Sequence, residues 1–266
     1  MVKRINVNYF KQKKKANEKI VALTAYDAPT AKFAEEAGIE LILVGDSLGM
    51  AVLGYDTTIP VTIEESIHHC CAVRRGAHGA FIVGDMPFMT YRLSIESTLK
   101  NAARYMQEAM VDAVKIEGGK EIADTIKMLV TAGVPVLGHI GLLPQSVKTA
   151  GGYKITGKTD LQAENLLEDA LAVQEAGAFA VVLEGVTKDV AKHITEKLEI
   201  PTIGIGAGVF CDGQIQVVND LLGLFTDFVP KHAKQYVNLG EKIKEAFESY
   251  HSDVTSSTFP TDKNSF

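Results

Sequence analysis

Leu41-Ile42-Leu43-Val44-Gly45-Asp46-Ser47 is a run of four aliphatic residues followed by a glycine, an aspartate and a serine. An uninterrupted apolar run bounded by turn residues is typical of a strand that is buried on both faces, as in a parallel sheet. A carboxylate directly after such a strand is costly unless something binds it. Three further apolar runs end in an acid in the same way, over residues 81–85, 113–117 and 180–184. The sequence therefore predicts buried strands that each deliver a carboxylate at the same end.

Strand-like runs alternate with helix-like segments along the whole chain. The predicted strands are residues 20–26, 41–47, 81–85, 111–117, 134–139, 179–184, 200–205 and, weakly, 228–229. Helices between successive strands require parallel pairing, and about eight such units in roughly 250 residues fit a (β/α)8 TIM barrel. A doubly wound open sheet is the alternative. It is disfavoured because no early strand is followed by the Gly-x-Gly-x-x-Gly turn of a dinucleotide fold.

The predicted domain organisation is a single barrel over residues 1–266. It has a short N-terminal extension and a polar, extended C-terminal tail at 251–266, and no linker or break in composition divides it. A helix is predicted over residues 214–222. The basic clusters at 11–15 and 74–75 are expected to be solvated.

Composition excludes several classes of partner. The net charge of −6 gives no general attraction to nucleic acid or to an anionic membrane. No apolar run approaches the roughly 20 residues of a membrane-spanning helix. The three cysteines, Cys70, Cys71 and Cys211, are too few for a disulfide framework. We therefore expect free thiols, a cytoplasmic location, and neither nucleic acid nor membrane as a partner.

The polar residues near the predicted strand ends converge on one rim. Strand side chains alternate between faces, so Lys115 and Glu117 share a face and must point into the barrel mouth, because the outer face packs on helices. Active sites of such barrels lie at the carboxyl ends of the strands. The predicted rim group is Asp46, Ser47, Asp85, Lys115, Glu117, His139 and Glu184.

Four carboxylates on one rim repel each other unless a cation or a proton intervenes. Oxygen ligands favour a hard ion such as Mg²⁺, which binds one or two carboxylates and keeps water for substrate. Asp46 and Asp85 are the predicted ligands, and Glu117 binds directly or through water. Two roles stay open for Lys115, a charge partner for a substrate carboxylate or a Schiff-base nucleophile. His139 is interpreted as a hydrogen-bond donor to substrate, with a metal ligand or a core histidine as alternatives.

Seven ordered segments carry a resemblance to a known family: residues 44–50, 73–77, 114–119, 138–142, 144–146, 151–154 and 203–208. Over about residues 6–266 the chain resembles the 3-methyl-2-oxobutanoate (ketopantoate) hydroxymethyltransferases. The resemblance implies transfer of a hydroxymethyl group from 5,10-methylenetetrahydrofolate to 3-methyl-2-oxobutanoate through a Mg²⁺-stabilised enolate. The product is 2-dehydropantoate, in pantothenate and coenzyme A biosynthesis. It also implies a homodecamer.

The resemblance assigns roles to the same rim residues. The metal positions of the family fall on Asp46, Asp85 and, directly or through water, Glu117. The contacts to the 2-oxo acid fall on Asp46, Ser47, Asp85 and Lys115. The catalytic base falls on Glu184. No residue of a folate pocket is indicated.

Three rival functions remain. The first is another Mg²⁺-enolate carbon–carbon lyase of the isocitrate lyase and phosphoenolpyruvate mutase type, although the Lys-Lys-Cys-Gly-His segment of those enzymes does not occur here. The second is a Schiff-base aldolase that uses Lys115. The third, a non-enzymatic scaffold or sugar-binding barrel, leaves Lys115 and Glu184 without a role.

Overall fold

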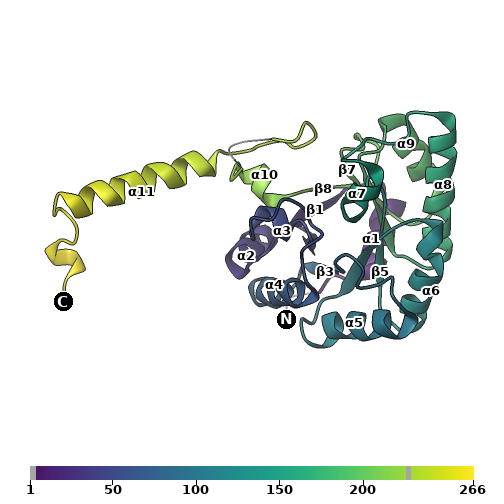
Figure 1. Cartoon of the computed structure of the whole chain (residues 1–266), viewed down its shortest axis with the longest axis horizontal. Coiled ribbons are helices and arrows are strands. Elements are labelled where there is room, and N and C mark those ends of the chain that lie inside the picture. Colours follow the sequence, from purple (N-terminus) through teal and green to yellow (C-terminus); the bar gives the residue numbers. More distant parts are fainter. Residues whose placement is uncertain (1–3, 226–228) are drawn as a thin grey trace. The chain divides into compact units, whose positions relative to one another are not determined.

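The computed structural model describes residues 4–225 and 229–266, and its eight strands form a closed barrel in sequence order (Figure 1). Every neighbouring pair is parallel, and β1 closes the barrel against β8. The predicted (β/α)8 fold is therefore confirmed. The strands are β1 (Ile20–Thr24), β2 (Leu41–Val44), β3 (Phe81–Asp85), β4 (Ala113–Glu117), β5 (Val136–Gly141), β6 (Ala180–Glu184), β7 (Thr202–Ile205) and β8 (Gly213–Gln216).

Helices connect the strands, and several begin at a capping residue that the sequence provides. The α2 helix starts after Asp27, whose carboxylate accepts a hydrogen bond from Thr30 N at 2.7 Å, and α4 starts with a capping box between Thr62 and Glu65. The helices before β8 are α1 (Val7–Lys15), α2 (Ala28–Glu36), α3 (Leu48–Ala51), α4 (Ile63–Gly76), α5 (Ile95–Gln107), η1 (Lys120–Ile122), α6 (Ala123–Thr131), η2 (Pro144–Ser146), α7 (Val147–Ala150), α8 (Asp160–Glu175) and α9 (Lys188–Lys197).

The barrel interior is filled by alternate side chains of all eight strands. Its buried cluster contains Ile20, Ala22, Leu41, Leu43, Phe81, Val83, Ala113, Leu137, Ala180, Val182, Ile203 and Ile215. Phe10 of α1 belongs to the same cluster and packs edge-on against Phe81, with ring centroids 5.1 Å apart. The N-terminal extension thus contributes to the core. Continuing the inward alternation from Val83, Ala113, Leu137 and Val182 brings Asp85, Lys115, His139 and Glu184 to the inner face as well.

Part of the basic N-terminal cluster is paired rather than solvated, contrary to expectation. Lys13 forms an ion pair with Glu40, and Lys14 Nζ lies 2.8 Å from the carboxylate of Asp212. Lys15 is exposed, as expected. These pairs connect α1 to the residues before β2 and β8, a contact between distant segments that sequence spacing does not reveal.

The expectation for residues 74–75 was also half wrong. Arg75 is exposed, but Arg74 is buried on α4 and forms an ion pair with Asp112, which also accepts a hydrogen bond from Ile82 N at 2.9 Å. A buried guanidinium is tolerated only with such a partner. The partner lies 38 residues further along the chain.

The eighth strand does not lie where the sequence predicts it. Residues 213–216 form β8 although 214–222 was predicted as helix, and only Val218–Leu222 are helical, as α10. Residue 228 of the predicted strand lies outside the described residues, and Val229 is not in a strand. The segment holds one inward apolar side chain, Ile215, so its sequence has too little periodicity to identify a strand.

The chain divides into two compact units, residues 1–216 and residues 217–266. The first unit holds the barrel. The second contains α10, α11 (Leu239–Thr255) and the short η3 (Asp262–Asn264). Helix α11 extends through Thr255. The prediction of an extended tail over residues 251–266 was therefore wrong for residues 251–255. That the whole chain is one domain stays a prediction.

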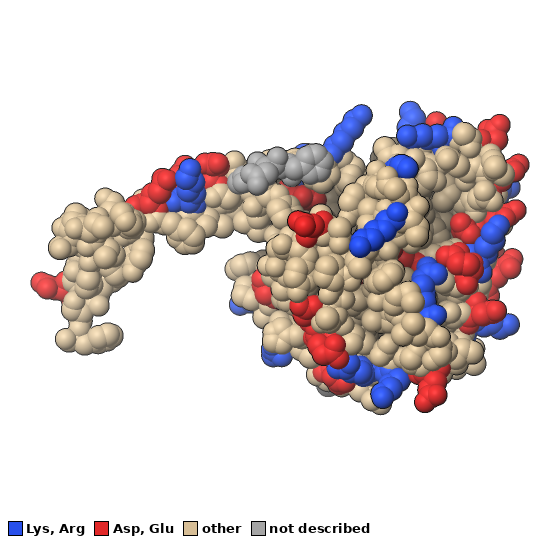
Figure 2. Space-filling model, viewed as in Figure 1, with Lys and Arg blue, Asp and Glu red and all other residues tan. Residues whose placement is uncertain are grey.

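The surface of the described residues has two plain features. No described helix is both long and apolar enough to cross a membrane. On the face shown in Figure 2, acidic and basic side chains are interspersed, and no extended basic patch appears.

We predict that Phe10→Ala destabilises the protein by about 3–5 kcal/mol, because it removes a large side chain from a closed core. Lys11→Ala on the exposed side of the same helix is the control and should change stability by no more than about 0.5 kcal/mol. Urea unfolding of the two variants measures the difference. Equal stability would mean that α1 does not close the barrel core.

Candidate active site

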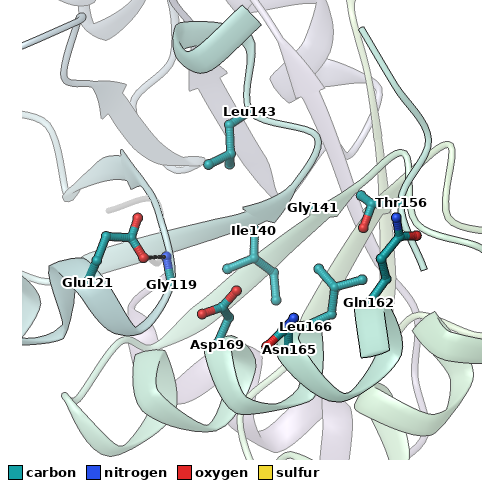
Figure 3. A pocket seen from close by; sticks show the side chains of 10 residues that line it. All are labelled: Gly119, Glu121, Ile140, Gly141, Leu143, Thr156, Gln162, Asn165, Leu166 and Asp169. Carbon is teal, nitrogen blue, oxygen red and sulfur yellow. Dashed lines mark hydrogen bonds between the residues drawn. The ribbon is translucent and has the colours of Figure 1, made fainter. Parts of the chain in front are cut away.

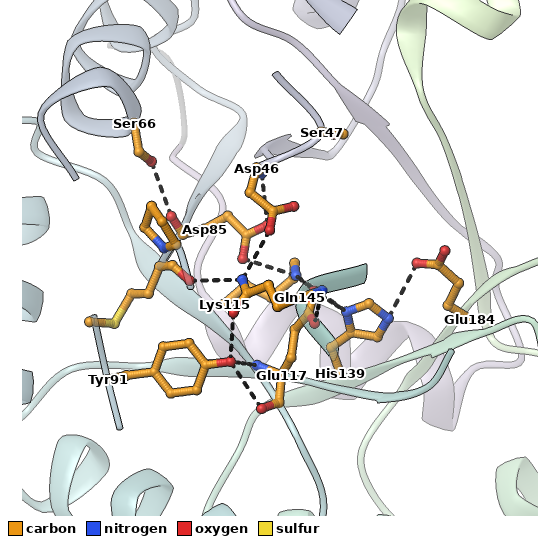
Figure 4. A network of polar contacts seen from close by, with 12 residues as sticks. Asp46, Ser47, Ser66, Asp85, Tyr91, Lys115, Glu117, His139, Gln145 and Glu184 are labelled. Carbon is orange, nitrogen blue, oxygen red and sulfur yellow. Dashed lines mark hydrogen bonds and ion pairs between the residues drawn. The ribbon is translucent and has the colours of Figure 1, made fainter. Parts of the chain in front are cut away.

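The structure brings the predicted rim residues together at the carboxyl ends of five neighbouring strands, β2 to β6 (Figure 4). Strand register sets their heights, since Asp85 is paired with Lys115 and Glu117 with His139 in the parallel ladders. Ser47 lies beside the others and shares a 2.8 Å hydrogen bond with Tyr26 OH. The remaining six form one connected network: Asp46, Asp85, Lys115, Glu117, His139 and Glu184.

Lys115 is the centre of this network. Its ammonium nitrogen lies 2.9 Å from Asp85 Oδ1, 3.4 Å from Glu117 Oε1 and 3.2 Å from His139 Nδ1. The lysine and both carboxylates are almost completely buried. Burial alone would lower the pKa of Lys115, but the charges of Asp85, Glu117 and Asp46 outweigh it and raise that pKa. The side chain is therefore a fixed positive charge.

The pKa values of the two buried carboxylates beside Lys115 are shifted in opposite directions. Burial opposes ionisation of both. For Glu117, Lys115 and His139 outweigh burial and lower the pKa to about 2. For Asp85, burial outweighs Lys115, and the pKa is raised. Different surroundings thus separate the affinities of neighbouring acids for a proton.

His139 bridges the buried part of the network to Glu184. Its Nδ1 lies 3.4 Å from Glu117 Oε1, and its Nε2 lies 3.3 Å from Glu184 Oε2. Burial and the Lys115 ammonium lower the pKa of His139, but the two glutamates outweigh them and raise it to about 9. The Glu184 side chain is 21% exposed, against 1% for Glu117. Glu184 therefore faces the open side of the mouth.

Asp46 has an excess of negative charge around it. Burial, then Asp85 and Glu117, raise its pKa well above the ordinary value. Its own backbone N–H donates to Asp85 Oδ2 at 2.9 Å, which fixes the Asp85 carboxylate beside the Asp46 backbone. The carboxylate oxygens of Asp46, Asp85 and Glu117 form a buried, oxygen-rich set that fits a hard cation.

No group of three His, Cys, Asp or Glu side chains within the described ranges converges closely enough to enclose a metal by itself. Mg²⁺ does not need such a cage, because it commonly binds one or two carboxylates and takes its other ligands from water and substrate. Asp46 and Asp85 suffice for that mode of binding.

Gln145 is a site residue that strand position did not indicate. From η2 its Nε2 donates to Asp46 Oδ2 at 3.0 Å and to Met86 O at 3.1 Å, and its backbone N–H donates to Glu117 Oε2 at 3.1 Å. It therefore orients two of the three buried acids at once. Its only trace in the sequence is the segment 144–146, one of those that carry the family resemblance.

Tyr91 fixes Gln145 in turn. Its buried hydroxyl donates to Gln145 Oε1 at 2.9 Å and accepts from Glu117 N at 3.2 Å. Arg92 stacks over the Tyr91 ring, 5.3 Å from its centroid, and donates to Glu117 O at 2.7 Å. Both residues follow β3 in a loop with no apolar periodicity, so sequence alone gives no sign of their position.

The structure also has a surface pocket of about 220 Å³ (Figure 3). It lies between the segment after β4, the end of β5 and helix α8. None of the predicted rim residues lines it; the lining residues are Gly119, Glu121, Ile140, Gly141, Leu143, Thr156, Gln162, Asn165, Leu166 and Asp169. We therefore place the chemistry at the network and not at this pocket.

The closed parallel barrel with a buried polar network at its carboxyl rim defines a TIM-barrel enzyme. Solved structures agree on the fold. A phosphonopyruvate hydrolase in complex with oxalate and Mg²⁺ matches with a TM-score of 0.63 and 13% identity over 98% of this chain and 93% of that one. A 2,3-dimethylmalate lyase of the phosphoenolpyruvate mutase/isocitrate lyase superfamily matches with a TM-score of 0.62 and 16% identity, over 98% and 91% of the two chains.

Sequence comparison identifies the family. The ketopantoate hydroxymethyltransferase family matches residues 4–262. A 3-methyl-2-oxobutanoate hydroxymethyltransferase of Dehalococcoides mccartyi is 54% identical over 263 residues, which are 99% of this chain and 94% of the relative. One of Syntrophus aciditrophicus is 50% identical over 264 residues, 99% and 97% of the two chains. The chain belongs to the ketopantoate hydroxymethyltransferase family and is a hydroxymethyltransferase.

We predict that Mg²⁺ stabilises the protein through Asp46. An acid whose pKa is higher folded than unfolded weakens the fold as the pH rises above its ordinary pKa, so at neutral pH Asp46→Asn should raise the melting temperature of the metal-free protein. At about 100 times its Kd, Mg²⁺ should stabilise the unsubstituted protein by about 2.7 kcal/mol, or roughly 5–10 °C.

Thermal unfolding with and without Mg²⁺ measures both effects. Asp46→Asn should lose most of the Mg²⁺-dependent shift. Asp169→Asn, which removes an acid of the surface pocket, should keep it. An equal shift in all three proteins would place the metal elsewhere.

Proposed function

We propose that the protein transfers a hydroxymethyl group from 5,10-methylenetetrahydrofolate to 3-methyl-2-oxobutanoate and so forms 2-dehydropantoate for pantothenate biosynthesis. The relatives named above support the 2-oxo acid and the group transferred. The observation that carries the proposal is the buried Lys115 ammonium among carboxylates, with the partly exposed Glu184 at the edge of the same network.

The proposed site for the 2-oxo acid lies beside the Lys115 ammonium and next to Asp46 and Asp85, which would leave some metal coordination positions free for substrate. Asp46 and Asp85 would hold Mg²⁺, with Glu117 bound directly or through water, and bound Mg²⁺ would supply the charge that stabilises the enolate of the substrate. The Lys115 ammonium neutralises the substrate carboxylate. Ser47, beside Asp46, donates or accepts a hydrogen bond at the same end of the substrate.

Glu184 is the proposed base. Its carboxylate takes the proton from C3 of 3-methyl-2-oxobutanoate, and the electron pair of that C–H bond passes into the enolate. Both C–N bonds that hold the one-carbon unit on the folate break. Water adds to that carbon and supplies the hydroxyl oxygen of the product, and C3 of the enolate forms the new C–C bond to the same carbon. The two folate nitrogens regain two protons, one from the water and the one taken from C3, and tetrahydrofolate leaves.

His139 is proposed to act mainly through Glu184. The imidazole lies between Glu117 and Glu184, 3.4 and 3.3 Å from their oxygens, and is itself buried. A direct hydrogen bond from His139 to substrate, which the sequence suggested, stays a prediction, because Nε2 has no hydrogen-bond partner among the described residues. The 3.3 Å separation of Nε2 from Glu184 Oε2 supports a role in orienting the base.

The Schiff-base alternative fits the geometry poorly. An amine must be neutral to attack a carbonyl, and lysines that do so have a lowered pKa. The surrounding carboxylates raise the pKa of Lys115. The carbon–carbon lyase alternative has support from fold similarity alone, at 13–16% identity. A homodecamer remains an expectation from the family resemblance, and a cytoplasmic location remains an expectation from the composition.

The role of Glu184 is tested without folate, by exchange of the C3 proton of 3-methyl-2-oxobutanoate in deuterated water. We predict that Glu184→Gln slows this exchange about 10²- to 10⁴-fold, because the amide keeps size and hydrogen bonding but lacks basicity. Substrate affinity should change little. Glu168→Gln, an exposed acid on α8, is the matched control. Normal exchange in Glu184→Gln would assign the base to another group.

The role of Lys115 is tested by trapping. Borohydride added together with 3-methyl-2-oxobutanoate should leave the protein mass unchanged, because a charged ammonium forms no imine. Lys115→Arg treated in the same way provides the baseline. A reduced adduct that maps to Lys115 by peptide mass spectrometry would establish the Schiff-base mechanism instead.

A further inference from the structure

Exposed apolar residues from two segments border the barrel mouth. Met50 and Val52 lie at the end of α3, shortly after Asp46, and Tyr153 and Ile155 lie in the loop after α7. Each of these four is between 40% and 53% exposed. Scattered apolar residues are ordinary on a surface. Here, however, the Tyr153 hydroxyl lies 3.8 Å from Met50 Sδ, so the two segments meet.

This contact spans the mouth. After α7 ends at Gly151 in the left-handed conformation, with φ of +66°, the loop is anchored where Thr156 N donates to Gly185 O at 2.9 Å, directly after β6. Met50 lies on α3, directly after β2. In the closed barrel β2 and β6 are opposite, with three strands between them on either side. A loop anchored at β6 that touches the helix after β2 therefore crosses above the network.

Electrostatics agrees with this position. Burial, then the charges of Asp46, Glu184 and Glu117, raise the pKa of Tyr153. These acids come from the ends of three different strands around the mouth. The phenol therefore lies within the field of all three, with its ring half-exposed to the outside.

The one-carbon donor has to approach from this side. Below the network the barrel is filled by its buried apolar cluster, and in the proposed reaction the reacting carbon of the 2-oxo acid faces Glu184, the partly exposed member of the network. The carrier of the one-carbon unit, a reduced folate, has a flat heterocyclic ring system. Flat rings pack favourably on aromatic side chains, and thioether sulfur packs favourably on rings.

We propose that Tyr153 and Met50 form the platform on which the heterocyclic ring of the folate co-substrate stacks. The inference rests on the proposed function and adds the co-substrate site to it. The same segment carries the exposed lysines Lys148, Lys154 and Lys158. The glutamate tail of folate is anionic, so it is repelled by the acids of the mouth and directed toward these lysines.

The experiment compares Tyr153→Ala, Tyr153→Phe and, as a control, Phe33→Ala, which removes an exposed aromatic ring from α2. Binding of tetrahydrofolate is measured by calorimetry, and the C3 proton exchange of 3-methyl-2-oxobutanoate is measured without folate. Tyr153→Ala should weaken tetrahydrofolate binding about 5- to 150-fold, the range for loss of one stacked ring. The C3 proton exchange rate, which does not depend on folate, should stay close to that of the unsubstituted protein. Tyr153→Phe keeps the ring and should bind almost normally, and Phe33→Ala should match the unsubstituted protein.

The outcomes separate the two proposals. Unchanged tetrahydrofolate affinity in Tyr153→Ala overturns the platform. So does a loss of exchange equal to the loss of binding, which would place Tyr153 at the 2-oxo acid. A failure of the unsubstituted protein to exchange the C3 proton overturns the proposed function itself, whatever the folate affinities are.

Discussion

The polar rim of this barrel depends on the ion pair between Lys115 and Asp85, whose charged atoms lie 2.9 Å apart in a buried site. An unpaired ammonium there would cost several kcal/mol, and the carboxylates without the lysine would repel one another. Because Lys115 also touches Glu117 and His139, one side chain holds both the acids that would bind a metal and the histidine that leads to Glu184. In the proposed reaction, substrate binding and proton transfer therefore both depend on the Lys115 ammonium.

The parallel strands make this arrangement possible. The strand register pairs Asp85 with Lys115, Glu117 with His139, and Gly141 with Glu184. Polar groups of neighbouring strands therefore lie side by side at the carboxyl end of the barrel. Backbone groups are held as well, since Tyr105 OH and Ser66 Oγ donate to Asp85 O at 2.7 and 3.0 Å. Rigid support of this kind keeps catalytic groups in place without a cost at the moment of reaction.

Residues from the loops beyond the strand ends complete the polar network. Gln145 and Tyr91 reach into the network from segments beyond the strand ends and hold the oxygens of Asp46 and Glu117 at defined positions. The loop that carries Tyr153 crosses to α3 on the opposite side of the mouth. Strands therefore set which charges meet, while loops orient the acids and limit the approach from outside.

The sequence by itself determined the barrel. Uninterrupted apolar runs indicate strands that are buried on both faces, and the acids that follow them mark the same end of each strand. It also determined which strand residues meet, since alternation and common strand ends place Lys115, Glu117 and Asp85 on one rim. Only the tertiary structure decided the position of β8, where one inward Ile215 is too weak a pattern without its neighbours β7 and β1. It alone revealed the buried Arg74 and Gln145, because their partners Asp112 and Asp46 lie 38 and 99 residues away and no local pattern encodes such a contact.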